Sequence, residues 1–241
     1  MHHEILEKLT NFWGKTFFIE PILICLFTFC FIISVWRHHN QRVRLAFSVY
    51  FFIGLLLFVV SSFVLAFQIY RGRKLAIFSE VSNTIFELAE FIAFYFFFKT
   101  SIQGPMFQKV LTIFLNLLVV VIGIFFAALA LPSYSIDYFK KHSLFINVLE
   151  FFFLAVMCLA YFYELFTSTP KINLFQRPSF FITTSLFFYS VLLIPFFMIA
   201  HYVFKNEWPF YRVLFACHFL LLAIMILTIS KAFLCRRPIT T

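Results

Sequence analysis

The residues best suited to chemistry in this sequence are four polar side chains spaced by three, four and three positions, which places them on one face of a helix. They are Glu80, Asn83, Glu87 and Glu90. The stretch around them is apolar and contains no Lys, Arg or His between residues 75 and 98. Because a carboxyl at mid-bilayer costs a few kcal/mol, we expect this face to point into a bundle interior or a wet cavity.

Such an acidic face has two chemical interpretations. Carboxylates crowded together without positive charge cannot all be ionised, so either some of them hold a proton or a cation lies among them. The same groups could instead be neutral and hydrogen-bonded to hydroxyl or amide groups of neighbouring helices. The sequence leaves both interpretations open.

Two further polar residues, Glu150 and His218, are expected to join this face from later spans. If alternate spans start at the same membrane face, a rise of about 1.5 Å per residue gives the depth of each residue. Glu80 and Glu150 then lie at a similar shallow depth, with His218 slightly deeper. This predicts an acidic cavity on the N-terminal side of the bundle, in which His218 could be a ligand, a proton relay or a hydrogen-bonded interior histidine.

The composition indicates the elements that must position these residues. The chain of 241 residues is 63% hydrophobic and only 12% charged, and its mean hydropathy is +0.98, which excludes a soluble globular protein. Apolar runs of about 20 residues, the length that a bilayer requires, occupy almost all of it. The net charge of +9 comes from short loops between these runs, so we do not expect nucleic acid as a partner. The predicted fold class is an all-α, seven-transmembrane-helix bundle whose surroundings are the lipid bilayer.

Three regions follow from this pattern. Residues 1–16 are predicted to be an interfacial amphipathic segment, residues 17–235 the transmembrane domain and residues 236–241 a short basic tail. Pro195 is expected to kink the sixth span, and Glu164, near the end of the fifth, is expected to meet a basic residue of the next loop. The spans are predicted at about residues 17–36, 45–70, 75–98, 107–131, 144–166, 178–204 and 210–234.

The orientation is predicted from basic residues near the span ends. They divide ten to nine between the two membrane faces, but the densest basic loop, after the first span, lies on the same face as the basic tail. We therefore expect the N-terminus outside and the C-terminus in the cytoplasm.

No complete catalytic signature is present. The last span has its only lysine, Lys231, at its very end, where a retinal Schiff base is not expected. The spans lack the several histidines of a zinc hydrolase and the Glu-x-x-His pairs of a carboxylate-bridged iron site. The five cysteines form no CxxC pair and are interpreted as small buried hydrophobic residues. An enzyme is the less favoured reading, and no cofactor is indicated.

Aromatic and apolar patterning in the later spans provides one resemblance. The segments are SNTIFELAEFIAFYFFF, INVLEFFFLAVMCLAYFYELF, RPSFFITTSLFFYSVLLIPFF and the closing KAFLCRR. They resemble small seven-helix membrane proteins of Bacteroidota and the N-terminal membrane sensor regions of some histidine kinases, although Ser179 and Phe180 follow Pro178 where that group usually has Trp. The resemblance implies a sensory or signalling role in a bacterial inner membrane, with a separate signalling partner and no catalytic residues.

These observations favour a receptor-like sensor whose acidic cavity binds a proton, a cation or a small ligand. A proton- or cation-coupled transporter or channel is the alternative, with Glu80, Glu87 and Glu90 along the ion path. A third possibility is a membrane metalloenzyme that uses Glu80, Glu87, Glu150 and His218.

Overall fold

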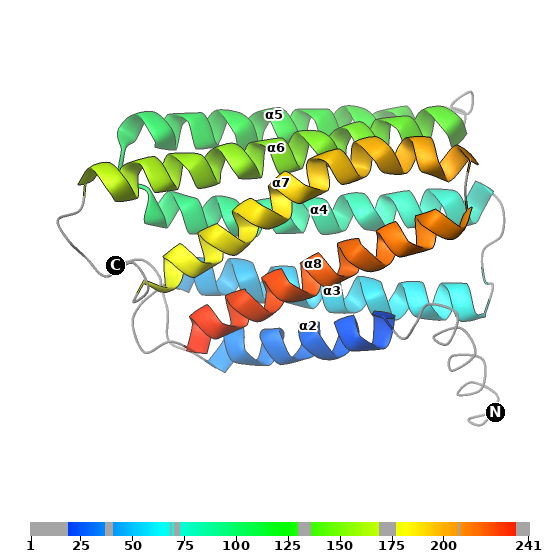
Figure 1. The fold of residues 1–241 in the computed structure, drawn as a ribbon, viewed down its shortest axis with the longest axis horizontal. Helices are drawn as coiled ribbons and strands as arrows, with labels where there is room; N and C mark the ends of the chain where they lie inside the picture. Colours follow the sequence, from blue (N-terminus) through cyan, green and yellow to red (C-terminus); the bar gives the residue numbers. More distant parts are fainter. Residues whose placement is uncertain are drawn as a thin grey trace.

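The computed structural model is a bundle of long helices (Figure 1), and the residues that it describes are 19–36, 41–67, 69, 73–129, 136–168, 177–206 and 208–234. Within these ranges all regular structure is helical, which confirms the predicted all-α fold class. The helices are α2 (Ile19–Trp36), α3 (Gln41–Ala66), α4 (Arg73–Ser101), α5 (Pro105–Leu129), α6 (Ile136–Ser168), α7 (Pro178–Asn206) and α8 (Trp208–Leu234).

Six of the helices form a closed ring. Each helix packs against its neighbour in sequence, and two further contacts, between α2 and α8 and between α4 and α6, complete the circle. The ring therefore runs α2, α3, α4, α6, α7, α8. The remaining helix, α5, packs only on the outside of α4 and α6 among the described elements, and in Figure 1 it lies along one edge of the bundle.

The predicted membrane spans are supported for six of these helices. Helices α3 to α8 are each long and apolar enough to cross a bilayer, whereas α2 contributes a shorter apolar helix, Pro21–Trp36. Large apolar side chains such as Ile113 and Ile124 of α5 remain exposed on the outside of the bundle, which suits a lipid-facing surface. The chain is therefore a multi-pass membrane protein. The predicted amphipathic segment 1–16 and basic tail 236–241 lie outside the described residues.

The fifth predicted span, residues 144–166, agrees with the apolar stretch Phe145–Thr167 of α6. The helix itself is longer and starts at Ile136. A helix can continue beyond the bilayer, where charged side chains reach water. Glu150 consequently lies as far from the start of α6 as Glu87 lies from the start of α4, about four turns in each case.

An aromatic core holds α2, α3 and α4 together. The fully buried ring of Phe27 on α2 lies 5.9 Å from the ring of Tyr50 and 5.4 Å from that of Phe58 on α3, and 5.9 Å from that of Phe86 on α4, measured between centroids. Gly54 of α3 lies directly beneath Phe27, and its lack of a side chain allows the ring to approach the backbone. This packing fixes Tyr50 on the inner side of the ring of helices.

Candidate functional site

Three carboxyl groups from two adjacent helices lie together inside the ring. Helix α4 contributes Glu87 and Glu90, which are 9% and 2% exposed, and α6 contributes Glu150, which is 1% exposed. Glu150 interacts electrostatically with both of the α4 carboxyls. We call Glu87, Glu90 and Glu150 the carboxyl cluster.

The cluster forms because α4 and α6 run in the same direction and are in register. Only α5 separates them in sequence, so both helices start at the same membrane face, and their direct contact places residues of equal depth side by side. Glu150 therefore meets Glu87 and Glu90, near the middle of α4. The sequence analysis placed Glu150 at the level of Glu80, seven residues earlier on α4, because it counted depth from residue 144 and not from the start of the helix.

Two tyrosines complete the site from neighbouring helices. The hydroxyl of Tyr50 on α3 donates a hydrogen bond to Oε2 of Glu90 over 3.3 Å. Tyr189 of α7 is 3% exposed and interacts electrostatically with all three carboxyls of the cluster. Sequence reasoning missed both residues, although a tyrosine in the middle of an apolar span is itself a signal, because a buried hydroxyl needs a hydrogen-bond partner.

Several oxygen atoms beside the cluster are buried without a protein partner. Among the described residues, neither carboxyl oxygen of Glu150 has a hydrogen-bond partner, and the same is true of Oδ1 of Asn147, one turn earlier on α6. On α7 the hydroxyls of Thr183 and Ser190 are likewise unpaired within the described part, and both residues are fully buried. Buried polar atoms of this kind normally bind water or a ligand.

His218 of α8 adjoins the cluster through an aromatic contact. Its imidazole is half-buried and lies 6.3 Å from the ring of Tyr189 and 5.6 Å from that of Phe196, in near-parallel arrangements. Tyr189 thus adjoins both the histidine and the carboxyls.

The two remaining residues of the predicted site also belong to α4. Asn83 shares the helical face of Glu87 and Glu90, but its side chain is exposed and is not buried with them. Ser82 and Thr84, the residues before and after Asn83, are buried against neighbouring helices. The side of α4 that carries Asn83 is not covered at this level. Glu80 lies within α4, but its side chain is outside the described part of the structure.

Glu164, the second glutamate of α6, has a different role. Its carboxylate accepts hydrogen bonds from the backbone N–H groups of Gln103 and Gly104, at 2.7 and 3.2 Å, immediately before α5 begins. A carboxylate at this position satisfies free N–H groups and interacts favourably with the helix dipole. Glu164 thus joins the α4–α5 turn to α6. The basic partner expected for it in the next loop stays a prediction, because residues 169–176 lie outside the described part of the chain.

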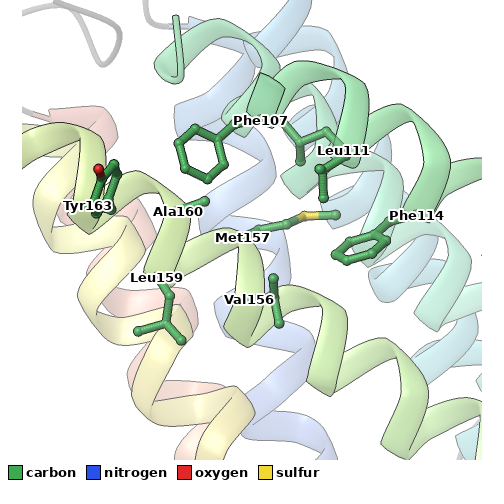
Figure 2. Close-up of a pocket in the computed structure, with 9 residues that line it drawn as sticks. Phe107, Leu111, Phe114, Val156, Met157, Leu159, Ala160 and Tyr163 are labelled. Carbon is green, nitrogen blue, oxygen red and sulfur yellow. The ribbon is translucent and has the colours of Figure 1, made fainter. Parts of the chain in front are cut away.

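An apolar groove is present on the outer side of α6. It has a volume of about 340 Å³ and lies between α5 and α6 (Figure 2), with Phe107 and Phe114 on one side and Met157 and Tyr163 on the other. Its lining is almost entirely apolar. The groove therefore offers no site for a proton or a cation, in contrast to the inner side of the same helix.

The arrangement is suited to proton binding more than to metal coordination. No group of three or more His, Cys, Asp or Glu side chains in the described part of the chain is placed to hold a metal ion. A proton needs only one carboxyl oxygen, and it would relieve the repulsion between neighbouring carboxylates. Comparison of this chain with protein-family models, with curated proteins and with solved structures finds no match.

Proposed function

We propose that the protein is a receptor-like sensor whose carboxyl cluster binds and releases a proton. The observation that carries the proposal is the burial of Glu90 and Glu150 on facing sides of α4 and α6, within electrostatic range of each other. Two carboxylates in a medium of low dielectric repel strongly, so the charge of the cluster controls the free energy of the α4–α6 contact.

The surroundings of the cluster favour a proton over an organic ligand. Tyr50 is packed between the rings of Phe51, Phe86 and Phe94, and Tyr189 lies against Phe151. Aromatic side chains thus occupy the space on both sides of the carboxyls. A proton occupies no volume of its own and requires no rearrangement of these rings.

The contact between α4 and α6 offers a way to transmit the signal. When Glu150 is neutral, α4 and α6 can remain in close contact, and loss of its proton adds repulsion that pushes them apart. Glu164, further along the same α6, holds the backbone of the α4–α5 turn. A shift of α6 would therefore move this turn at the membrane face, which is a small displacement of packed helices coupled to a charge change.

The α4–α5 turn lies at the membrane face where α4, α6 and α8 end. In the orientation expected from the basic residues, this face is cytoplasmic. The resemblance to proteins of Bacteroidota favours a bacterial inner membrane. We propose that a separate signalling protein contacts the α4–α5 turn there.

Infrared difference spectroscopy of the full chain in lipid nanodiscs, between acidic and alkaline buffer, tests the proposal. Protonated carboxyls absorb apart from carboxylates, so a band that appears in acid and is absent in Glu150→Gln would identify Glu150 as a proton-binding group. Glu164→Gln is the matched control on the same helix, because its carboxyl bonds backbone amides at the membrane face, and it should leave that band unchanged. Spectra in which Glu150→Gln matches the parent protein would contradict the proposal.

Proton-coupled transport is a second candidate, favoured by the position of Glu87 one turn from Glu90 on the same buried face of α4. Consecutive carboxyls along a helix can pass a proton between them. Liposomes that contain the protein and a pH-sensitive dye would distinguish the two functions. A transporter should show proton flux that Glu87→Gln abolishes, whereas a sensor should show the infrared band without flux.

A further inference from the structure

We propose that protons reach Glu150 along the α6–α7 interface, from the membrane face where α6 ends and α7 begins, through the hydroxyls of Thr183 and Ser190. This inference rests on the proposed proton-binding function of the cluster and adds its access route. The route follows from the register of the two helices and from hydroxyl groups that have no partner in their own helix.

The register is set by one hydrogen bond. Near the membrane face where α6 ends and α7 begins, the hydroxyls of Tyr161 on α6 and Ser179 on α7 are 2.8 Å apart. Glu150 precedes Tyr161 by the same number of positions as Ser190 follows Ser179, which is about three helical turns. Because the helices are antiparallel neighbours with equal rise per residue, Ser190 is at the level of Glu150.

A ring contact confirms this register close to the cluster. The next residue after Glu150, Phe151, lies 5.5 Å from the ring of Tyr189, which precedes Ser190. Thr183 is on the same buried face of α7, between Ser179 and Ser190, at about 6 Å from the first and about 10 Å from the second along the axis. The hydroxyls thus form a sequence of steps from the end of the helix pair to the carboxyl.

Several hydroxyls of the bundle bond within their own helix, whereas those of Thr183 and Ser190, like those of Ser62, Ser101 and Thr184, have no partner among the described residues. Thr28, Thr112 and Thr228 each donate to the carbonyl four residues earlier, and Ser185 of α7 itself donates to the carbonyl of Ile182 over 3.0 Å. Hydroxyls in apolar helices usually adopt such bonds. Thr183 and Ser190 make none within the described residues, although both are fully buried. Water molecules between α6 and α7 are the partners that would satisfy them.

Each proton transfer along this route breaks one O–H bond and forms another. A hydronium ion at the membrane face gives a proton to the first water of the chain, each water and hydroxyl accepts one proton and donates another, and the last transfer forms the O–H bond of the Glu150 carboxylic acid. No oxidant or cofactor takes part. Rotation of the hydroxyls then restores the starting arrangement.

The titratable groups that face Glu150 come from four other helices. They are Glu87 and Glu90 of α4, Tyr50 of α3, Tyr189 of α7 and, behind Tyr189, His218 of α8. Helix α5 carries only Lys109, close to its start and therefore near the level of the far end of α6. Of these groups only Tyr189 belongs to α7, where it contacts Phe151 of α6 next to Ser190.

The test follows the infrared band of Glu150 in time after protons are released from a photolabile proton donor, with the full chain in nanodiscs. We expect Thr183→Val and Ser190→Ala to slow the appearance of the band about tenfold or more. Ser185→Ala, which removes a hydroxyl already bonded within α7, should leave the rate unchanged. Thr183→Ser should restore the rate, which separates loss of the hydroxyl from general damage to packing.

Each other outcome has a definite meaning. If the band appears in Thr183→Val and Ser190→Ala at the rate of the parent protein, the route is overturned and the proposed function stands. The same follows if Ser185→Ala slows the band as much as Thr183→Val and Ser190→Ala do. Slowing by His218→Phe alone would also overturn the route, because the proton would then pass along α8 and not along the hydroxyls of α7. If the parent protein has no band that depends on Glu150, the proposed function itself fails.

Discussion

Replacement of Gly54 by Ala tests how much the close α2–α3 contact contributes to the stability of the bundle. A Cβ atom at this position would lie 2.7 Å from Cδ1 and 3.0 Å from Cζ of Phe27, and closer still to Cε1. Carbon atoms do not approach so closely, so either the ring or the helix must move. The ring is held by its contacts with Tyr50, Phe58 and Phe86, so α2 and α3 must separate instead.

The magnitude follows from two opposing effects. Overpacking of a full core typically costs about 1–3 kcal/mol. Replacing Gly with Ala in a helix stabilises the helix by up to about 1 kcal/mol. We therefore expect Gly54→Ala to lower the free energy of unfolding by about 1–2 kcal/mol. Because Tyr50 contacts the displaced ring, its hydrogen bond to Glu90 should weaken in the same variant.

Unfolding by sodium dodecyl sulfate in mixed micelles, followed by circular dichroism, measures this change. Gly123→Ala in α5 is the matched control, since nothing lies within 4 Å of a Cβ built there, and it should be neutral or slightly stabilising. A second substitution, Phe27→Leu, should relieve the clash, so the double variant should lose less than the sum of the two single changes. Equal stability of Gly54→Ala and Gly123→Ala would refute the reasoning.

Three further predictions concern single polar groups. Tyr50→Phe removes the hydrogen bond to Glu90 but keeps the ring, so stability should fall by about 0.5–1 kcal/mol in the same unfolding assay, and a larger loss would point to a role in packing. Glu164→Ala removes the acceptor at the start of α5 and should cost about 1 kcal/mol, with faster hydrogen exchange of the two amides before that helix; unchanged exchange would contradict the assignment. Asn83→Leu should change stability by less than about 0.5 kcal/mol and leave the infrared band of Glu150 intact, because Asn83 is exposed.

Glu87 and Glu90 of α4 show how much of the site could be predicted from the sequence. Glu87 and Glu90 stand out because the bilayer penalises charge, so two carboxyls inside an apolar span need a buried partner. Helical periodicity then placed them on one face. Periodicity could not reveal that Asn83, on the same face, is exposed, because exposure depends on which neighbouring helix covers each level.

The partners of Glu87 and Glu90 depend on contacts between residues that are distant in sequence. Glu150 reaches the cluster because α4 and α6 touch directly and α5 is displaced to the outside. Tyr50 and Tyr189 point inward because α3 and α7 flank these two helices in the ring. Such choices are made by the shapes of side chains at each helix surface, and no local pattern encodes them.

The sequence by itself determined that this is a helical membrane protein with an acidic interior, and it located most of the helices. The physical reason is that bilayer thickness and the cost of burying charge act on every short segment separately. Only the tertiary structure decided the ring order, the exclusion of α5, the earlier start of α6 and the hydroxyls opposite Glu150. These features arise from packing between whole helices, where one turn of register changes which polar groups meet.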